Sequence, residues 1–376
     1  MQSNSLSFLI ILFAKIFICT CYLTNFNNDY NYDDYTDEDY VKTGYIKQFL
    51  DHFNSSDKRV WSQRFHYFDK FFKTGSPVFL RIGGQFAEDT IVLEQSQLMD
   101  SYGPKFNAYL TALETRYYGE SRPTRNTSLE NLKYLARKQM FADVAEFIKK
   151  FKTEIDPRTR TSKWILFGCS FAATLAADMR LLYPNLVAGA VASSAPFKPS
   201  INFAHYLSLT AIAIHRQSKN CVINTRKAFN QLSLVIKTKS NLGQLEKFDL
   251  CHHLNISDSK SVALFMLKLI TIFQTAAQYD RQKGYFWIEE LCKIMNNRKI
   301  ESLIERLAIV SRKQRYSCWD VSYENFINLL RKTSWDSYSD KFLGDRMYAY
   351  QTCTEYGSFQ TTDQKLKVFG NFLPLE

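Results

Sequence analysis

Histidine is scarce in this sequence of 376 residues, and the usual metal and cofactor motifs are missing. Six histidines occur, and none follows His253. There is no CxxC pair and no HExxH segment, and Cys251, His252 and His253 place three donors on consecutive positions, which is not zinc-ligand spacing. Because no GxGxxG follows a strand and no P-loop occurs, the sequence predicts neither a metal nor a cofactor.

Long blocks of basic or apolar residues are few as well. The net charge is +11, but the basic residues come in short clusters such as 158–163, so we expect no nucleic-acid partner. The apolar run 6–19 contains Lys15 and is short for a membrane span. Its position is typical of a secretory signal peptide, placed here at 1–21, with a signal anchor as the alternative and no stable membrane association after cleavage.

Basic residues are absent from 25–40, which consists mainly of Asp, Asn and Tyr. Such a run cannot form a hydrophobic core, so we expect an acidic disordered segment over 22–43. Six cysteines lie outside the predicted signal peptide, and sequons occur at Asn54, Asn126 and Asn255. Both features fit a secretory compartment, where disulfides and N-glycans form.

The stretch 164–177 carries the strongest chemical pattern in the chain. Four apolar residues at 164–167 predict a buried strand, and the small residues 172–177 predict a closely packed helix. Ser170 lies between them, next to Gly168, as expected for a nucleophile elbow that exposes a serine hydroxyl at a helix N-terminus. The alternative is an ordinary strand-to-helix turn in which the serine is an N-cap.

Strand and helix patterns alternate around this elbow. We expect strands at 77–82, 109–114 and 186–192, and a capping box at 127–130 opening a helical region that continues through 140–151. This alternation predicts a parallel, doubly wound sheet, and a serine elbow on such a sheet is typical of the α/β-hydrolase fold. The glycine pair after the first of these strands, which includes Gly84, offers N–H groups to an oxyanion.

The character of the chain changes after about Pro199. Long helical periodicities such as 262–277 follow, with little strand signal. We therefore expect an inserted helical cap that covers the carboxyl edge of the sheet. We therefore predict a first part of the hydrolase core at 44–201, a helical cap at 202–345, and a return to the core at 346–376 that lacks the last strands of the fold.

Several blocks together resemble a family of lysosomal and secreted serine exopeptidases, which contains prolylcarboxypeptidase, dipeptidyl peptidase II and thymus-specific serine protease. The blocks are QFLDHF (48–53), WSQRF (61–65), FLRIGG (79–84), ALETRYYGESRP (112–123), ENLKYL (130–135), 167–177, AVASSAP (190–196) and YQTCTEYG (350–357). The resemblance covers about 44–376 and is greatest to the thymus-specific branch.

The resemblance implies a serine-type peptidase with a Ser-Asp-His triad, acting on peptide substrates beside proline, and a secreted or lysosomal location. Ser170 matches the family nucleophile, and the N–H groups of Phe171 and Gly84 match the oxyanion hole. Two disulfides are also implied, Cys221–Cys292 and Cys251–Cys318, although four cysteines by themselves allow three connectivities.

Five positions depart from the family pattern. Cys169 and Ala173 stand where glycine is usual, and Thr115 stands where histidine is usual. Gln85 and Phe86 replace a Glu-Gly pair, and the first of these changes removes a charge near the expected site. The recognition of a substrate's amino terminus is therefore not carried over to this chain.

A base for Ser170 is the missing part, because in this fold the triad aspartate and histidine follow the serine in the chain. The chain therefore looks truncated, and two functions stay open: a peptidase seen as a fragment, or a non-catalytic secreted binding or decoy protein derived from that family. An esterase or lipase is a third reading. Cys353 should be unpaired, which leaves a homodimer open.

Overall fold

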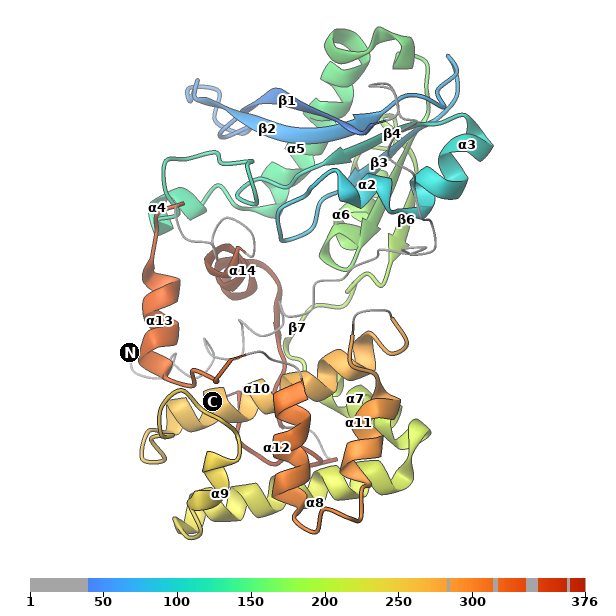
Figure 1. Cartoon of the computed structure of the whole chain (residues 1–376). Coiled ribbons are helices and arrows are strands. Elements are labelled where there is room, and N and C mark those ends of the chain that lie inside the picture. The colour runs from blue at the N-terminus through green and yellow to red at the C-terminus, as the bar shows by residue number, and fades with distance from the viewer. Residues whose placement is uncertain (1–39, 283–284, 314–316, 336–343, 364–365, 376) are drawn as a thin grey trace. The chain divides into compact units, whose positions relative to one another are not determined.

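The computed structural model describes residues 40–282, 285–313, 317–335, 344–363 and 366–375. The predicted signal peptide and residues 22–39 of the acidic segment lie outside these ranges, whereas Lys42 and Thr43 already belong to the first strand. The described chain divides into two compact units. The sheet unit comprises 40–199 with 333–351, and the helical unit comprises 200–332 with 352–375 (Figure 1).

The sheet unit contains six strands in the order β1-β2-β4-β3-β5-β6. Their bounds are β1 Lys42–Phe49, β2 Val60–Phe68, β3 Val78–Ile82, β4 Tyr109–Leu113, β5 Trp164–Cys169 and β6 Val187–Ser193. Strands β4, β3, β5 and β6 are parallel to one another, as expected. At one edge the sheet also contains an antiparallel pair that was not predicted, because β1 and β2 pair antiparallel and β2 joins β4 antiparallel.

Helices cover both faces of this sheet. The elements are α2 Ile91–Glu94, η4 Leu98–Tyr102, α3 Gly103–Phe106, α4 Leu129–Leu132, α5 Arg137–Lys150, η5 Phe151–Ile155, η6 Pro157–Thr159, α6 Phe171–Leu182 and α14 Asp345–Gln351. Alternation along β3 directs Leu80 toward α5 and α6, and Phe79 toward α2 and η4. This strand order, with helices on both faces and a serine elbow on β5, is the α/β-hydrolase fold.

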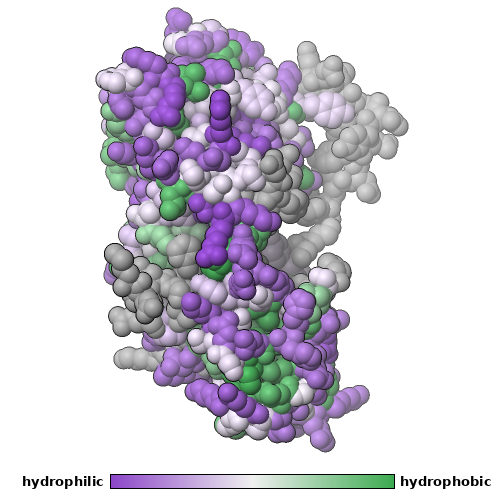
Figure 2. Space-filling view, turned by 90° about the vertical axis from the view of Figure 1, so that its left-hand side faces the viewer, coloured by the Kyte–Doolittle hydropathy of each residue, from purple (hydrophilic) through white to green (hydrophobic). Residues whose placement is uncertain are grey.

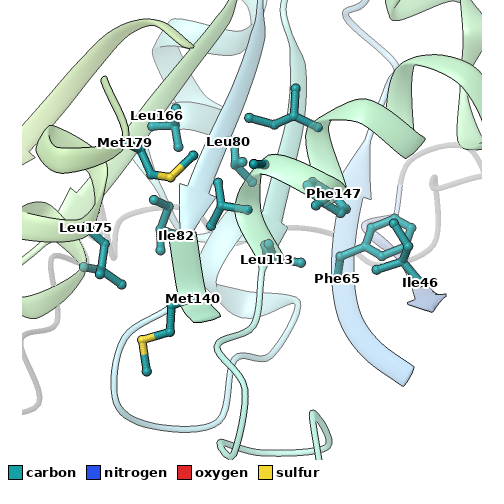
Figure 3. Close-up of a cluster of buried hydrophobic side chains, with 14 of the residues drawn as sticks. Ile46, Phe65, Leu80, Ile82, Leu113, Met140, Phe147, Leu166, Leu175 and Met179 are labelled. Atoms are coloured by element: carbon teal, nitrogen blue, oxygen red, sulfur yellow. The ribbon is translucent and has the colours of Figure 1, made fainter. Parts of the chain in front are cut away.

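The larger core lies on the α5 and α6 face. It joins apolar residues of all the strands from β1 to β6 to the inner sides of the two helices. Figure 3 shows part of this core, in which Met179 of α6 lies beside Leu166 of β5 and Phe147 of α5 lies beside Phe65 of β2. The core fixes the position of α6, and thereby of the turn that precedes it.

The predicted continuous helical region from 127 to 151 is interrupted in the structure. Ser128 is the N-cap of the short helix α4, and its side chain makes no capping hydrogen bond. The buried hydroxyl of Thr127 instead donates to the carbonyl oxygen of Thr333, at 3.1 Å. Helix α4 ends at Leu132, and α5 begins only at Arg137. The capping box therefore predicted the start of a helix but not its length.

The helical unit is built around α10. Its elements are β7 Ser200–Asn202, α7 His205–Gln217, α8 Lys219–Thr238, α9 Gly243–Glu246, α10 Ser259–Gln278, α11 Ile288–Met295, α12 Leu303–Lys313, α13 Tyr323–Arg331, η8 Thr352–Tyr356 and β8 Gly357–Phe359. Asp258 caps α10 by accepting from two first-turn N–H groups. Within the described ranges, α10 alone has the length and hydropathy of a membrane span, and 83% of that window is buried, as in a core helix of a soluble protein.

The last described residues pack on the helices of this unit. Phe369 makes edge-to-face contacts with Phe229 of α8 and Phe273 of α10, at ring distances of 5.5 and 5.6 Å. We expected 346–376 to rejoin the sheet; residues 346–351 group with the sheet unit, whereas 352–375 group with the helices through these contacts. The face drawn in Figure 2 is mainly hydrophilic, with hydrophobic residues gathered over the helical unit.

Candidate active site

Ser170 occupies the turn between β5 and α6 in a strained backbone conformation. Its φ of 54° and ψ of −121° lie in a region that residues other than glycine rarely adopt. The Ser170 N–H donates to the carbonyl oxygen of Ser193 in β6, and the Ser170 carbonyl oxygen accepts from the N–H of Ala173, each at 3.0 Å. These two bonds hold the turn from the sheet side and from the helix side.

Gly168 allows the strand and the helix to meet at this turn. A Cβ atom at this position would lie 2.2 Å from the carbonyl oxygen of Ala172 and 2.6 Å from the nitrogen of Ala173. Both neighbours are backbone atoms at the start of α6, so they cannot rotate away. A side chain at position 168 would therefore force the strand and the helix apart.

Phe171 is the first residue of α6 and directly follows the serine. Its N–H belongs to the first turn of the helix, where backbone N–H groups point out of the helix end and the dipole favours negative charge. This is the position expected for the first oxyanion donor, and it depends on the backbone rather than on the side chain.

The loop after β3 holds the second expected donor, Gly84. In the register between β3 and β5, Arg81 lies opposite Phe167. Because β3 and β5 are parallel neighbours, the loop that holds Gly84 and the turn that holds Ser170 leave the same edge of the sheet. In the structure, the Gly84 N–H donates to the Glu88 carboxylate at 3.0 Å.

Two departures from the family pattern have structural roles in this loop. The Thr115 hydroxyl donates to the carbonyl oxygen of Gly83 at 2.7 Å. The Gln85 side-chain amide donates to the side-chain oxygen of Gln351 at 3.0 Å, and that oxygen also accepts from the Tyr118 hydroxyl at 2.6 Å. A carboxylate at position 85 could not donate this bond, so the neutral amide fits its neighbour.

The histidines of the sheet unit are bonded elsewhere. His66, on β2, contacts the Thr43 hydroxyl through Nδ1 at 2.9 Å, and His52 contacts Asp143 through Nε2 at 2.8 Å. Strand β2 is three strands from β5, about 14 Å, and His52 follows β1, which is four strands away, about 19 Å. Both imidazoles are thus bonded to other side chains, and their elements are not neighbours of β5 in the sheet.

A buried ionic cluster near the start of β2 escaped the sequence prediction. The Arg116 guanidinium donates to both carboxylate oxygens of Asp143, at 2.6 and 2.7 Å, and lies over the Trp61 ring. Arg116 is fully buried and Asp143 is 1% exposed. The signal in the sequence was the lone Asp143 within the apolar inner face of α5.

A second buried acid follows β4. Burial raises the pKa of Glu114 to about 7, although the Arg64 guanidinium donates to this carboxylate at 2.6 Å and favours its charged form. Burial also lowers the pKa of His66. Burial therefore raises the pKa of Glu114 and lowers the pKa of His66, so it favours the uncharged form of both groups.

The remaining predicted residues are the cysteines of the helical unit and the asparagines of the sequons. Disulfides join Cys221 to Cys292 and Cys251 to Cys318 in the helical unit, and Cys353 is a free, exposed thiol. Among the sequons, Asn54 and Asn255 are exposed and Asn126 is half-buried. In the described part of the chain, no cluster of three or more His, Cys, Asp or Glu is arranged to hold a metal ion.

Comparisons with known proteins agree on one family. The profile of the family described as serine carboxypeptidase S28 matches residues 48–376. A Caenorhabditis elegans protein named as a serine protease and the mouse (Mus musculus) thymus-specific serine protease are each 31% identical, over 84% and 85% of this chain and 63% and 65% of their own lengths. The Homo sapiens lysosomal Pro-X carboxypeptidase is 25% identical over 83% of this chain and 64% of its own. The chain thus spans about two thirds of the length of these relatives.

Proposed function

Because the chain belongs to the serine carboxypeptidase S28 family, we propose that it acts as a serine-type exopeptidase with Ser170 as its nucleophile. The observation that carries this proposal is the strained turn at Ser170, with φ 54° and ψ −121°, between β5 and α6. A strained residue that the surrounding structure holds in place is typical of a functional site. An ordinary N-cap serine has unstrained β-region angles, so a simple strand-to-helix turn with a serine N-cap does not account for this conformation.

The proposed reaction is acyl transfer. The Ser170 hydroxyl oxygen attacks the carbonyl carbon of a peptide bond, a base takes its proton, and the C–N bond breaks as the amine leaves with a proton. Water then attacks the resulting acyl ester, which releases the carboxylic acid and restores the Ser170 hydroxyl. Negative charge develops on the carbonyl oxygen, where the Phe171 N–H and an N–H of the loop after β3 would stabilise it. Relatives named Pro-X carboxypeptidase support a preference for bonds beside proline and a secreted or lysosomal location.

A second candidate is a secreted binding or decoy protein without catalytic activity. It is favoured by the placement of His52 and His66, which are bonded to Asp143 and Thr43 and lie far from Ser170 along the sheet. Without a base the serine hydroxyl stays protonated and is a weak nucleophile. In that case the fold would keep the elbow but not the reaction.

Labelling with a fluorophosphonate separates the two candidates. We expect no labelling of the 376-residue chain and clear labelling of a chain extended to the length of its relatives. Ser170→Ala should abolish labelling and lower kcat by about 10⁴- to 10⁶-fold in the extended chain. Ser194→Ala is the matched control, because Ser194 also has a positive φ, of 55°, but follows β6. An extended chain that resists labelling would reject the peptidase and favour the binding protein.

A further inference from the structure

The loop from Gly83 to Glu88 is fastened to the neighbouring strand at its first residue. The Gly83 N–H donates to the carbonyl oxygen of Leu113 at 2.8 Å, and the Thr115 hydroxyl donates to the Gly83 carbonyl oxygen. A Cβ atom on Gly83 would lie 2.8 Å from the same Leu113 oxygen, so a glycine is needed for this approach. The loop therefore leaves β3 in a defined direction.

The next residue donates its N–H to a carboxylate of the same loop. Oε1 of Glu88 accepts from the Gly84 N–H at 3.0 Å, and Oε2 of Glu88 lies 3.5 Å from Nε of Arg81. Glu88 is fully buried. Water therefore does not compete for this bond, and hydrogen bonds to a carboxylate are stronger than those to a neutral acceptor.

The backbone of Glu88 is held as firmly as its side chain. Its N–H donates to the Glu114 carboxylate at 3.0 Å, and its carbonyl oxygen accepts from the Arg64 guanidinium. Glu114 accepts from Arg64 as well, so one buried ionic group fixes both the loop end and the strand end. The position of the Glu88 carboxylate is thus set by several contacts at once.

Gly84 also belongs to the loop that leaves the carboxyl end of β3, beside the parallel strand β5 that leads into Ser170. In this fold the second oxyanion donor is an N–H of the loop that follows β3. One N–H directed at a carboxylate cannot make a second strong, linear bond to another oxygen. Two acceptors, Glu88 and a substrate oxyanion, would therefore compete for the Gly84 N–H.

We propose that Glu88 is a positioning residue whose carboxylate occupies the Gly84 N–H in the resting protein, so that this donor reaches a second acceptor only when Glu88 releases it. The proposal rests on the proposed function, because a reaction at Ser170 is what would present an oxyanion to Gly84. It deepens that function by naming the group that controls the second donor. The occupied N–H itself can be observed without any reaction.

Isotope labelling with glycine isolates this one amide. Of the 13 glycines, Gly83 and Gly84 are the one consecutive pair. In protein labelled with ¹³C-carbonyl, ¹⁵N-glycine, an experiment that correlates each N–H with the preceding carbonyl therefore gives a single signal, from Gly84. We expect this proton to resonate downfield in the wild-type chain and to exchange slowly with solvent.

Substitutions at Glu88 then decide the proposal. In Glu88→Ala the Gly84 signal should move upfield and exchange on the order of 10- to 100-fold faster, as expected for loss of a hydrogen bond to a charged group. Glu88→Gln keeps the size of the side chain, so it serves as the test if Glu88→Ala does not fold. It should give a smaller upfield shift of the Gly84 signal, because its acceptor oxygen is neutral. Glu94→Gln, at an exposed position of α2, is the matched control and should leave the signal in place.

A Gly84 signal that is the same in wild type and in Glu88→Gln would overturn the proposal, because the charge of Glu88 would then not act on this amide. This outcome is independent of Ser170 labelling. Labelling in the extended chain with a Gly84 signal insensitive to Glu88 rejects the positioning role and keeps the peptidase. A Glu88-dependent signal without labelling keeps the positioning role and rejects the peptidase.

Discussion

A Cβ atom on Gly168 would lie 2.2 Å from the carbonyl oxygen of Ala172, so β5 and α6 approach each other as closely as a glycine permits. We predict that Gly168→Ala lowers the free energy of unfolding by about 1–3 kcal/mol or more, because two backbone segments must separate. Urea denaturation measures this loss. Gly189→Ala in β6 is the control, since the nearest atom to its new methyl group is 4.0 Å away. Equal stabilities of the two variants would contradict the prediction.

Strain at Ser170 should be measurable as a stability difference. Its φ of 54° with ψ of −121° costs roughly 1–3 kcal/mol for a residue with a Cβ atom and little for glycine. We therefore predict that Ser170→Gly is more stable than Ser170→Ala by about 1 kcal/mol in thermal or chemical unfolding. Both variants lack the hydroxyl, so the comparison isolates the backbone. Two variants of the same stability would show that the turn is relaxed.

The Arg116–Asp143 pair should be a major contributor to stability. Asp143→Asn leaves the buried Arg116 guanidinium without its charge partner, and loss of one member of a buried pair costs about 3–5 kcal/mol. The partly exposed pair of Arg137 and Asp178 supplies the control, because Asp178→Asn should cost at most about 1 kcal/mol. Denaturant midpoints would test this. Similar losses in both variants would mean that burial of the first pair does not matter.

Glu114 should make the sheet unit more stable in acid. Its pKa is about 7 in the folded chain and near 4.5 when exposed, so the folded state holds a proton that the unfolded state has released between these values. This contribution is fully present below pH 4.5 and is lost as the pH rises to 7, a change of roughly 3 kcal/mol. His66 has the opposite effect on stability: because its pKa is lowered in the folded chain, its contribution is lost as the pH falls.

The Glu114→Gln variant isolates this effect, because His66 is present in both proteins. We expect the difference in unfolding free energy between wild type and Glu114→Gln to shift in favour of the variant as the pH rises from 4.5 to 7. Denaturation at several pH values provides the measurement. A difference that does not change with pH would contradict the raised pKa of Glu114.

Cys353 is expected to form intermolecular disulfides. It is a free, exposed thiol, whereas Cys221, Cys251, Cys292 and Cys318 are paired. An unpaired exposed thiol in an oxidising compartment is prone to pair with a second chain. Non-reducing electrophoresis of the chain produced in a secretory host should show dimers that Cys353→Ser removes. Dimers that persist in the variant would assign the cross-link to another cysteine.

The sequence and the structure agree where the pattern is local. A buried strand, a glycine, a serine and a run of small residues specify the β5–α6 turn, because close packing there needs small side chains at fixed spacing. The parallel strands β3, β4 and β6 follow in the same way from short apolar runs. The antiparallel pair β1 and β2 was not predicted, because neither strand contains the continuous apolar run that marked the parallel strands.

The sequence by itself determined the nucleophile candidate, the fold class and the family, since each depends on residues that are neighbours in the chain. The tertiary structure alone decided that Arg116, Asp143 and His52 form one buried cluster, and that Glu88 occupies the N–H of Gly84. Hydrogen bonds between separate loops and strands depend on register and loop direction, and these are set by packing of the whole sheet. The composition of the chain and the spacing of its motifs therefore do not predict these hydrogen bonds.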